Sequence, residues 1–428
     1  IFFLYVKQKK IIWFVLIGLI LGLVFLTKAE VFLAIGISIS FGIFFLFLIE
    51  RPPISKIIIF LFIFCVMAVL PIIGFIIYFK FYMPFREAIY SLFVQYCIIF
   101  KKEVSSNLFY KTVMGTEQLS ESIFEIIESG IWYISLSFIL FMIGVLEKIF
   151  NKFRNRIINF VIIIIIFFVS YFIFKILRFK LDKGLSFAMI ILLFYSFFSL
   201  MQTYQKKFLE DMPKKLLFFL LILFALILLY RMFLNTHIYH YGFALAMPSM
   251  LLLITFFLYI FPKILEKKYN VLLIRYIVLF LIGMMIFSYL GITRKIYSSK
   301  KIPVGYGKDI ILTFNLYGNI INLTLNKIKE IIQPNETMLV LPESIMLNYL
   351  TRIKNPTRYI NIITPILEFF GEKEILNNFK KNTPDYVVIL DRDLREYGYI
   401  AFGKDYAVSI YNWVVDNYIP LLLIKPSE

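Results

Sequence analysis

The stretch IIIFLFIFCVMAVLPIIGFIIYF, residues 57–79, decides the fold because it runs for 23 residues without a charged side chain. A helix needs about 20 mostly apolar residues to cross the hydrocarbon core of a bilayer. The rest of the chain has the same character, since 61% of its 428 residues are hydrophobic, 19% are aromatic and the mean hydropathy is +0.85. Soluble domains hold about 45–50% apolar residues. The sequence therefore predicts an integral membrane protein.

Other apolar runs extend this to an α-helical polytopic protein with about nine transmembrane helices. The nine candidates are 11–26, 31–49, 57–79, 131–146, 157–177, 185–201, 216–234, 241–261 and 271–292. The chain opens at Ile1 with IFFLYV directly before KQKK, which has the composition of the last turns of a spanning helix. We therefore expect the chain to be truncated at its N-terminus.

The net charge of +18 lies mostly in short loops between the apolar runs, which favours membrane topology over nucleic-acid binding as its explanation. Loops 1–10, 50–56, 147–156, 202–215 and 262–270 hold sixteen Lys and Arg residues, whereas loops 27–30, 178–184 and 235–240 hold four. Basic loops stay in the cytoplasm. The sequence thus predicts a multi-pass protein of the cell (plasma or inner) membrane, with residues 80–130 and everything after 292 outside.

Composition divides the chain into a transmembrane domain, 1–292, and an extracytoplasmic α/β domain, 293–428. In the second domain, strand-length apolar runs at 337–341, 386–390 and 419–424 alternate with amphipathic patterns at 364–381 and 404–417, which predicts a largely parallel sheet. Within 80–130, FREAIYSLFVQY and LSESIFEIIE show helical periodicity, and we expect interfacial helices that cover a cavity. An ordinary extramembrane loop is the alternative.

Lys28 and Glu30 stand in the outward turn LTKAE between two apolar runs. Such a cation could bind a phosphate, and the carboxylate could orient the lysine or an acceptor hydroxyl. The alternative is that both residues only end helices at headgroup level. Arg86 in MPFREAIY is a further possible phosphate ligand or part of a solvated face.

RFKLDKG, residues 178–184, departs from the charge rule by placing three cations outside, which suggests a site for an anionic lipid headgroup unless two helices are misassigned. The three are Arg178, Lys180 and Lys183.

Metal and nucleotide motifs are weak in this chain. His237 and His240 form an H-x-x-H pattern in an outward loop, but zinc needs further ligands, and histidines beside tyrosines are also typical of the aromatic belt. Asp391 and Asp393 form a D-x-D after a predicted strand, where turn formation explains them better than a cation on a nucleotide sugar. P-loop, GxGxxG, HExxH, GxSxG and paired CxxC motifs are absent from the sequence.

Several segments together resemble bacterial members of glycosyltransferase family 39, the dolichyl-phosphate-mannose-protein-mannosyltransferase-like enzymes of the GT-C class. The segments are GLVFLTKAEVFLA, FYMPFREAIYSLF, SNLFYKTVMG, YHYGFALAMP, and the tail from LPESIMLNYLTRIKNPTRY to NTPDYVVILDRDLREYGYIAFGKDY. In this resemblance Lys28 matches a lysine that lines the donor-phosphate cavity in the aminoarabinose transferase branch, and Glu30 matches a carboxylate common at that turn. His240 and Tyr241 lie at a family-like helix start.

The resemblance implies an inverting hexosyltransferase that moves a sugar from a polyprenyl-phosphate carrier to a hydroxyl of a lipid, glycan or protein. The family's catalytic Asp is expected upstream of this fragment, so no catalytic residue is assigned; a divalent cation is possible, although no metal site is identifiable. The substrate-binding candidates are Lys28, Glu30, Arg86, Lys183, His240 and Tyr241. Alternatives are a flippase or binding protein for lipid-linked sugars without chemistry, or an O-antigen polymerase or ligase-like enzyme. Partners would be the donor and membrane lipids, with no nucleic acid.

Overall fold

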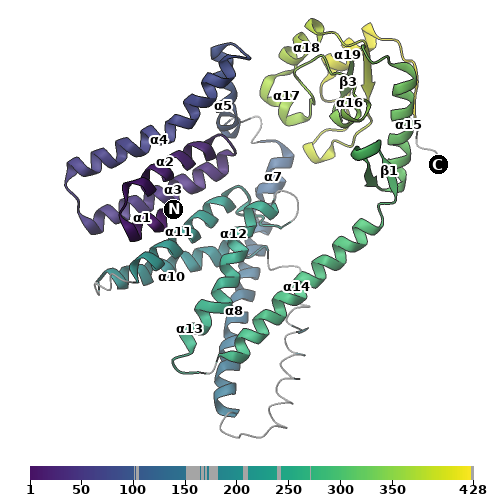
Figure 1. The fold of residues 1–428 in the computed structure, drawn as a ribbon. Coiled ribbons are helices and arrows are strands. Elements are labelled where there is room, and N and C mark those ends of the chain that lie inside the picture. The colour runs from purple at the N-terminus through teal and green to yellow at the C-terminus, as the bar shows by residue number, and fades with distance from the viewer. Residues whose placement is uncertain are drawn as a thin grey trace. The chain divides into compact units, whose positions relative to one another are not determined.

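The chain folds into two compact units in a computed structural model that describes residues 1–100, 102, 106–150, 164, 168, 171, 172, 182–205, 211–238, 242–269 and 271–425 (Figure 1). The helical unit comprises Ile1–Cys97 and Thr112–Met285. The C-terminal unit comprises Ile98–Lys111 and Ile286–Glu428. Each unit has its own apolar core, as described below.

The helical unit consists of helices joined by short connections. Its elements are α1 (Phe2–Gln8), α2 (Ile11–Phe25), α3 (Ala29–Glu50), α4 (Ile54–Lys80), α5 (Phe85–Phe100), α7 (Leu108–Met114), α8 (Leu119–Phe150), α10 (Leu185–Gln205), α11 (Met212–Leu229), the 3₁₀ turn η2 (Tyr230–Met232), α12 (Gly242–Thr255), the π-helical stretch η3 (Phe256–Ile260), α13 (Phe261–Leu265) and α14 (Leu272–Ser298). Helices α5, α7 and α14 each cross between the units, because residues 98–100, 108–111 and 286–298 belong to the C-terminal unit.

Seven helices in the described part of the chain are long and apolar enough to cross a membrane, and α2 is a shorter apolar helix. The chain is therefore a multi-pass membrane protein. The candidate at 157–177 lies outside the described residues except at four positions, so a count of nine is not established. Large apolar side chains on the outer faces of the helices agree with a lipid environment: Phe62 is 68% exposed and Phe138 is 62% exposed.

Two apolar clusters hold the helical unit together. One joins α8, α10, α11, α12 and α14 and includes Leu140, Met189, Ile222 and Ile274, each fully buried. The other joins α1, α2, α3, α10 and α11 around the buried ring of Phe14. Because lipid is as apolar as these side chains, close packing rather than the hydrophobic effect must hold helices together within a membrane.

The predicted boundary between an interfacial helix and a span near residue 130 is wrong. The structure has a single 32-residue helix, α8, that contains both LSESIFEIIE and the predicted span 131–146. Gly130 does not break this helix; instead it lets the Phe187 ring approach, since a Cβ at Gly130 would lie 2.6 Å from a ring carbon. The polar first turns of α8 therefore belong to the same helix as the predicted span, and no separate helix begins near residue 131.

The C-terminal unit combines helices with two small sheets. Its elements are β1 (Ile302–Val304), η4 (Gly307–Asp309), β2 (Ile311–Thr313), α15 (Asn315–Ile331), β3 (Met338–Leu341), α16 (Ile345–Thr351), α17 (Thr364–Phe370), α18 (Glu372–Lys381), β4 (Tyr386–Ile389), η5 (Arg395–Tyr397) and α19 (Val408–Asn417). Strands β1 and β2 pair antiparallel. Strands β3 and β4 pair in parallel, with Met338 opposite Tyr386.

Strand β3 is fully buried on both faces. Leu339 and Leu341 belong to a cluster with α18 and α19, whereas Met338 and Val340 belong to a cluster with α15 and α16. Successive side chains of a strand point to opposite faces, so helices cover both sides of this sheet, as in α/β folds. The apolar run MLVL has no alternation for this reason.

Two features of this unit differ from the prediction. The pattern at 364–381 is two helices, α17 and α18, which meet at Gly371 with φ of +86°, a conformation that side chains other than glycine rarely adopt. Residues 419–424 were expected to form a strand, but they pair with no strand in the described part of the unit, and Ile419 is 86% exposed. The run is apolar enough for a strand, yet no strand among the described residues is paired with it.

Candidate functional site

Polar side chains from four separate connections of the helical unit form two groups of contacts, Glu30 with Arg231 and Lys183 with Asn235 and Glu125, which share segment 230–238. The connections are the turn between α2 and α3, the first turns of α8, the residues just before α10, and segment 230–238 after α11. Segment 230–238 links the set, because Arg231 contacts the first connection and Asn235 contacts the second and third through Lys183. We call this set the turn cluster.

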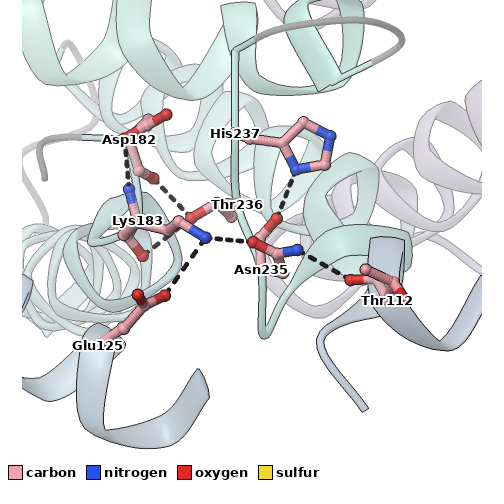
Figure 2. Close-up of polar contacts among 7 residues, drawn as sticks. All are labelled: Thr112, Glu125, Asp182, Lys183, Asn235, Thr236 and His237. Carbon is pink, nitrogen blue, oxygen red and sulfur yellow. Dashed lines mark hydrogen bonds and ion pairs between the residues drawn. The ribbon is translucent and has the colours of Figure 1, made fainter. Parts of the chain in front are cut away.

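Lys183, a predicted binding residue, makes contacts with both Glu125 and Asn235 in the part of the cluster that Figure 2 draws. Its ammonium group donates a hydrogen bond to Oδ1 of Asn235 and lies 3.3 Å from a carboxylate oxygen of Glu125. The Asn235 amide in turn donates to the backbone oxygen of Thr112 at 2.9 Å. The lysine side chain is 25% exposed, so its charge is held in place while still meeting solvent.

Asp182 and Thr236 fix the backbone under Lys183. The Asp182 carboxylate accepts a hydrogen bond from the backbone N–H of Lys183 at 3.1 Å. The fully buried Thr236 hydroxyl lies 2.5 Å from the backbone oxygen of Asp182 and 2.8 Å from that of Lys183. Burial raises the pKa of Asp182, and the backbone hydrogen bonds and the Lys183 charge oppose that rise. The carboxylate is therefore a part of the turn before α10.

His237 is buried next to the cluster and has a packing role. Its Nδ1 lies 2.7 Å from the backbone oxygen of Asn235, so this nitrogen carries the proton. Gly242 is the reason the ring fits, since a Cβ there would lie 2.5 Å from a carbon of that ring. His240 and Tyr241, the other predicted residues of this loop, lie outside the described residues, as do Arg178 and Lys180. Among the described residues, no group of three or more metal-ligating side chains exists.

Glu30 forms an ion pair that the sequence analysis missed. Its carboxylate lies 2.7 Å from a guanidinium nitrogen of Arg231, with side-chain exposures of 20% and 38%. Glu30 therefore orients Arg231, and in the described residues it does not contact Lys28, which was its expected partner. A lone arginine at the end of the apolar run LLFFLLILFALILLYRMF was the available signal, because a charge at such a point needs a partner or a function.

Lys28 lies at the N-cap of α3 and is partly exposed. Its side chain has no hydrogen bond or ion pair within the described residues, which leaves the ammonium available for a ligand. Nearby, Tyr96 and Gln95 of α5 donate hydrogen bonds to the backbone oxygen of Phe25 at 3.0 and 3.2 Å. They hold α5 over the C-terminal end of α2, directly before the turn that carries Lys28.

Arg86 is exposed in the first turn of α5, and no contact joins it to the turn cluster among the described residues.

The D-x-D motif of the C-terminal unit has hydrogen bonds of its own. Asp393 accepts hydrogen bonds from the guanidinium of Arg395, which lowers the pKa of the aspartate to about 2. This is turn chemistry, as the sequence analysis favoured.

The turn cluster thus offers cations on three connections, Lys28, Arg231 and Lys183, with carboxylates and an amide that hold two of them in place. Such a set can bind a phosphate and the hydroxyl groups of a sugar. No protein-family model matches the chain, and no curated protein or solved structure matches it either.

Proposed function

We propose that the chain is a glycosyltransferase of the cell membrane that uses a polyprenyl-phosphate-linked sugar and that the turn cluster binds the donor. The observation that carries the proposal is the bond between Lys183 and Asn235. It joins the cationic turn before α10 to the chain segment that also carries Arg231, which is paired separately with Glu30. A lipid phosphate needs such cations at the end of a membrane bundle, where its headgroup lies.

The bias of basic residues toward the opposite loops supports an extracytoplasmic position for the turn cluster. In the transfer, an acceptor hydroxyl oxygen bonds to the anomeric carbon while the bond from that carbon to the phosphate oxygen breaks. The acceptor proton passes to a base. The polyprenyl phosphate leaves as an anion, and Lys28, Arg231 and Lys183 stabilise its negative charge. We assign no base, because the Asp182 carboxylate is committed to the turn before α10.

A flippase or non-catalytic binding protein is the competing function. A transporter binds its cargo near the middle of the membrane, on charged or broken helices. In contrast, the cations and carboxylates of the turn cluster all lie at helix ends or in connections. This placement favours chemistry at a membrane surface.

Binding and transfer are tested separately. The purified chain in detergent is titrated with a polyprenyl monophosphate, with the corresponding polyprenol as the control for the lipid tail alone. We expect Lys28→Met and Lys183→Met each to weaken the affinity for the monophosphate by about tenfold, because each variant loses one charge-assisted contact. Binding of the polyprenol should be unchanged. Lys80→Met, which removes a cation at the end of α4 outside the cluster, is the matched control.

Transfer is then followed in membranes that contain the chain together with whatever sequence its gene encodes before Ile1, as release of polyprenyl phosphate from a labelled polyprenyl-phosphate hexose together with a labelled product. Release that depends on Lys28 and Lys183 supports the transferase. Tight, lysine-dependent binding with no release of polyprenyl phosphate would assign the chain to the binding proteins. Equal affinities for the polyprenyl monophosphate and the polyprenol would rule out the cluster as a donor site.

A further inference from the structure

An apolar surface lies at the opposite ends of the helices from the turn cluster, where α3 and α10 end. A cavity of about 320 Å³ opens there between the last turns of both helices. Its walls are apolar and come from Phe45, Leu48 and Met201, while Arg51 and Tyr204 provide its polar groups. Ligand pockets in proteins range from about 300 to 1,000 Å³, so the cavity suits a headgroup with the first part of a chain.

Arg51 has no carboxylate partner within the described residues. The neighbouring Glu50 forms an ion pair with Lys9 of the α1–α2 connection instead. Arg51 itself is exposed and adopts φ of +44° directly after α3. Its guanidinium is therefore a positive charge without a carboxylate partner among the described residues, at a helix end of a membrane protein and beside an apolar cavity.

Tyr204 supplies a second polar group at the same place. Its ring packs near that of Phe45, with centroids 6.5 Å apart, and the residue is 40% exposed. A phenol can donate a hydrogen bond to an oxyanion, and a guanidinium can donate two in parallel. Leu48, 51% exposed, continues the apolar wall toward the outer surface of the bundle.

From this arrangement we propose that the cavity binds an anionic glycerophospholipid. The guanidinium of Arg51 holds the phosphate diester, the Tyr204 hydroxyl donates to it, and the first part of an acyl chain lies along Phe45 and Met201. The net charge of the headgroup decides the selectivity, because a zwitterionic headgroup brings its own cation close to Arg51. The site is independent of the turn cluster and of the proposed transfer, and it needs no particular orientation in the membrane.

The test uses the full chain in detergent and native mass spectrometry. Phosphatidylglycerol and phosphatidylcholine with identical acyl chains are titrated, and inorganic phosphate is the arm that tests the headgroup chemistry without a lipid. We expect phosphatidylglycerol to be retained over phosphatidylcholine by about tenfold, and Arg51→Gln to abolish that preference. Lys56→Gln removes an equal charge from the exposed first turn of α4, outside the cavity. This variant should keep the preference for phosphatidylglycerol.

A second variant tests the cavity rather than the charge. Met201→Trp fills the wall while Arg51 remains, and it should reduce retention of phosphatidylglycerol about as much as Arg51→Gln does. The proposal is overturned if Arg51→Gln and Lys56→Gln behave alike, if both lipids are retained equally by the unchanged chain, or if inorganic phosphate displaces the lipid at an equal concentration.

Discussion

Glu30 and Arg231, 201 positions apart in the sequence, join the first turn of α3 to the end of α11 at 2.7 Å. Arg231 stands on the same connection as Asn235, so the pair also positions the segment that contacts Lys183. The ion pair therefore has a structural role in the turn cluster besides any role in binding.

Glu30→Gln, Arg231→Met and the double variant should form a cycle with a coupling free energy of about 1 kcal/mol, because the pair is partly shielded from water. The free energy of unfolding in detergent measures it. Glu30→Gln combined with Arg294→Met, which removes an exposed arginine of α14, is the control and should be additive. Additivity in the Glu30–Arg231 cycle as well would show that the pair contributes no stability.

Thr236→Val should destabilise the helical unit by about 1–3 kcal/mol. Valine fills nearly the same volume, but the backbone oxygens of Asp182 and Lys183 would then lose their buried hydroxyl donor. Thermal unfolding in detergent checks this. Thr255→Val is the matched control, because that hydroxyl bonds only to Leu251 of its own helix, and we expect its effect to stay within about 0.5 kcal/mol. Equal losses in both variants would contradict the role of Thr236.

The sequence was sufficient for the membrane class and for the parallel strands β3 and β4, because both depend on local apolar runs. It was not sufficient for features that depend on contacts between distant segments. Glu30 was in a predicted turn and Arg231 on a predicted helix far along the chain, and no local pattern relates them. Residues 419–424 have the composition of a strand, but pairing needs a partner edge, which composition does not reveal. Lys183 was found from its charge, whereas Asn235, which positions it, carries no pattern of its own.

Lowering the pH should weaken the start of the parallel sheet through Asp385. Its carboxylate accepts hydrogen bonds from both the backbone N–H and the hydroxyl of Thr337, each at 2.7 Å, and these bonds lower the pKa of Asp385 below its ordinary 3.8. A lowered pKa means that the stabilisation is present at neutral pH and is lost as the pH falls below about 4 toward the folded-state pKa.

Hydrogen exchange of the β3 and β4 peptides in the full chain measures this effect. At neutral pH, the β3 and β4 amides of Asp385→Asn should exchange faster than those of the unchanged chain. This difference in exchange rate should vanish at low pH. Asp416→Asn, at an exposed position of α19, should show no difference at either pH. A difference between Asp385→Asn and the unchanged chain that stays constant with pH would contradict the charge as its cause.

The double variant Leu421→Asp, Leu423→Asp should leave the C-terminal unit as stable as before, within about 0.5 kcal/mol, because these side chains are 67% and 76% exposed. Leu339→Ala is the contrasting variant, since Leu339 is fully buried in β3 and its truncation should cost about 2–5 kcal/mol. Chemical denaturation of the full chain, followed by hydrogen exchange in this unit, measures both. A loss of several kcal/mol from the double variant would restore the predicted third strand.

Gly22→Ala should separate α2 from α4 and destabilise the helical unit by about 1–3 kcal/mol. Gly18 and Gly22 have the four-residue spacing that lets membrane helices approach closely, and a Cβ at Gly22 would lie 2.1 Å from the backbone oxygen of Ala68 in α4. A backbone atom cannot move aside as a flexible side chain can, so the helices themselves must shift.

Gly74 of α4 provides the matched control, because a Cβ there would meet nothing within 4 Å. Gly74→Ala should be neutral or stabilise the protein by up to about 1 kcal/mol, since alanine favours the helix over glycine. Gly36→Ala, whose Cβ would meet only the end of Leu21 at 3.9 Å, should resemble Gly74→Ala. Thermal unfolding in detergent ranks the three variants. If Gly22→Ala were as stable as the other two, α2 and α4 could not be packed backbone to backbone at this position.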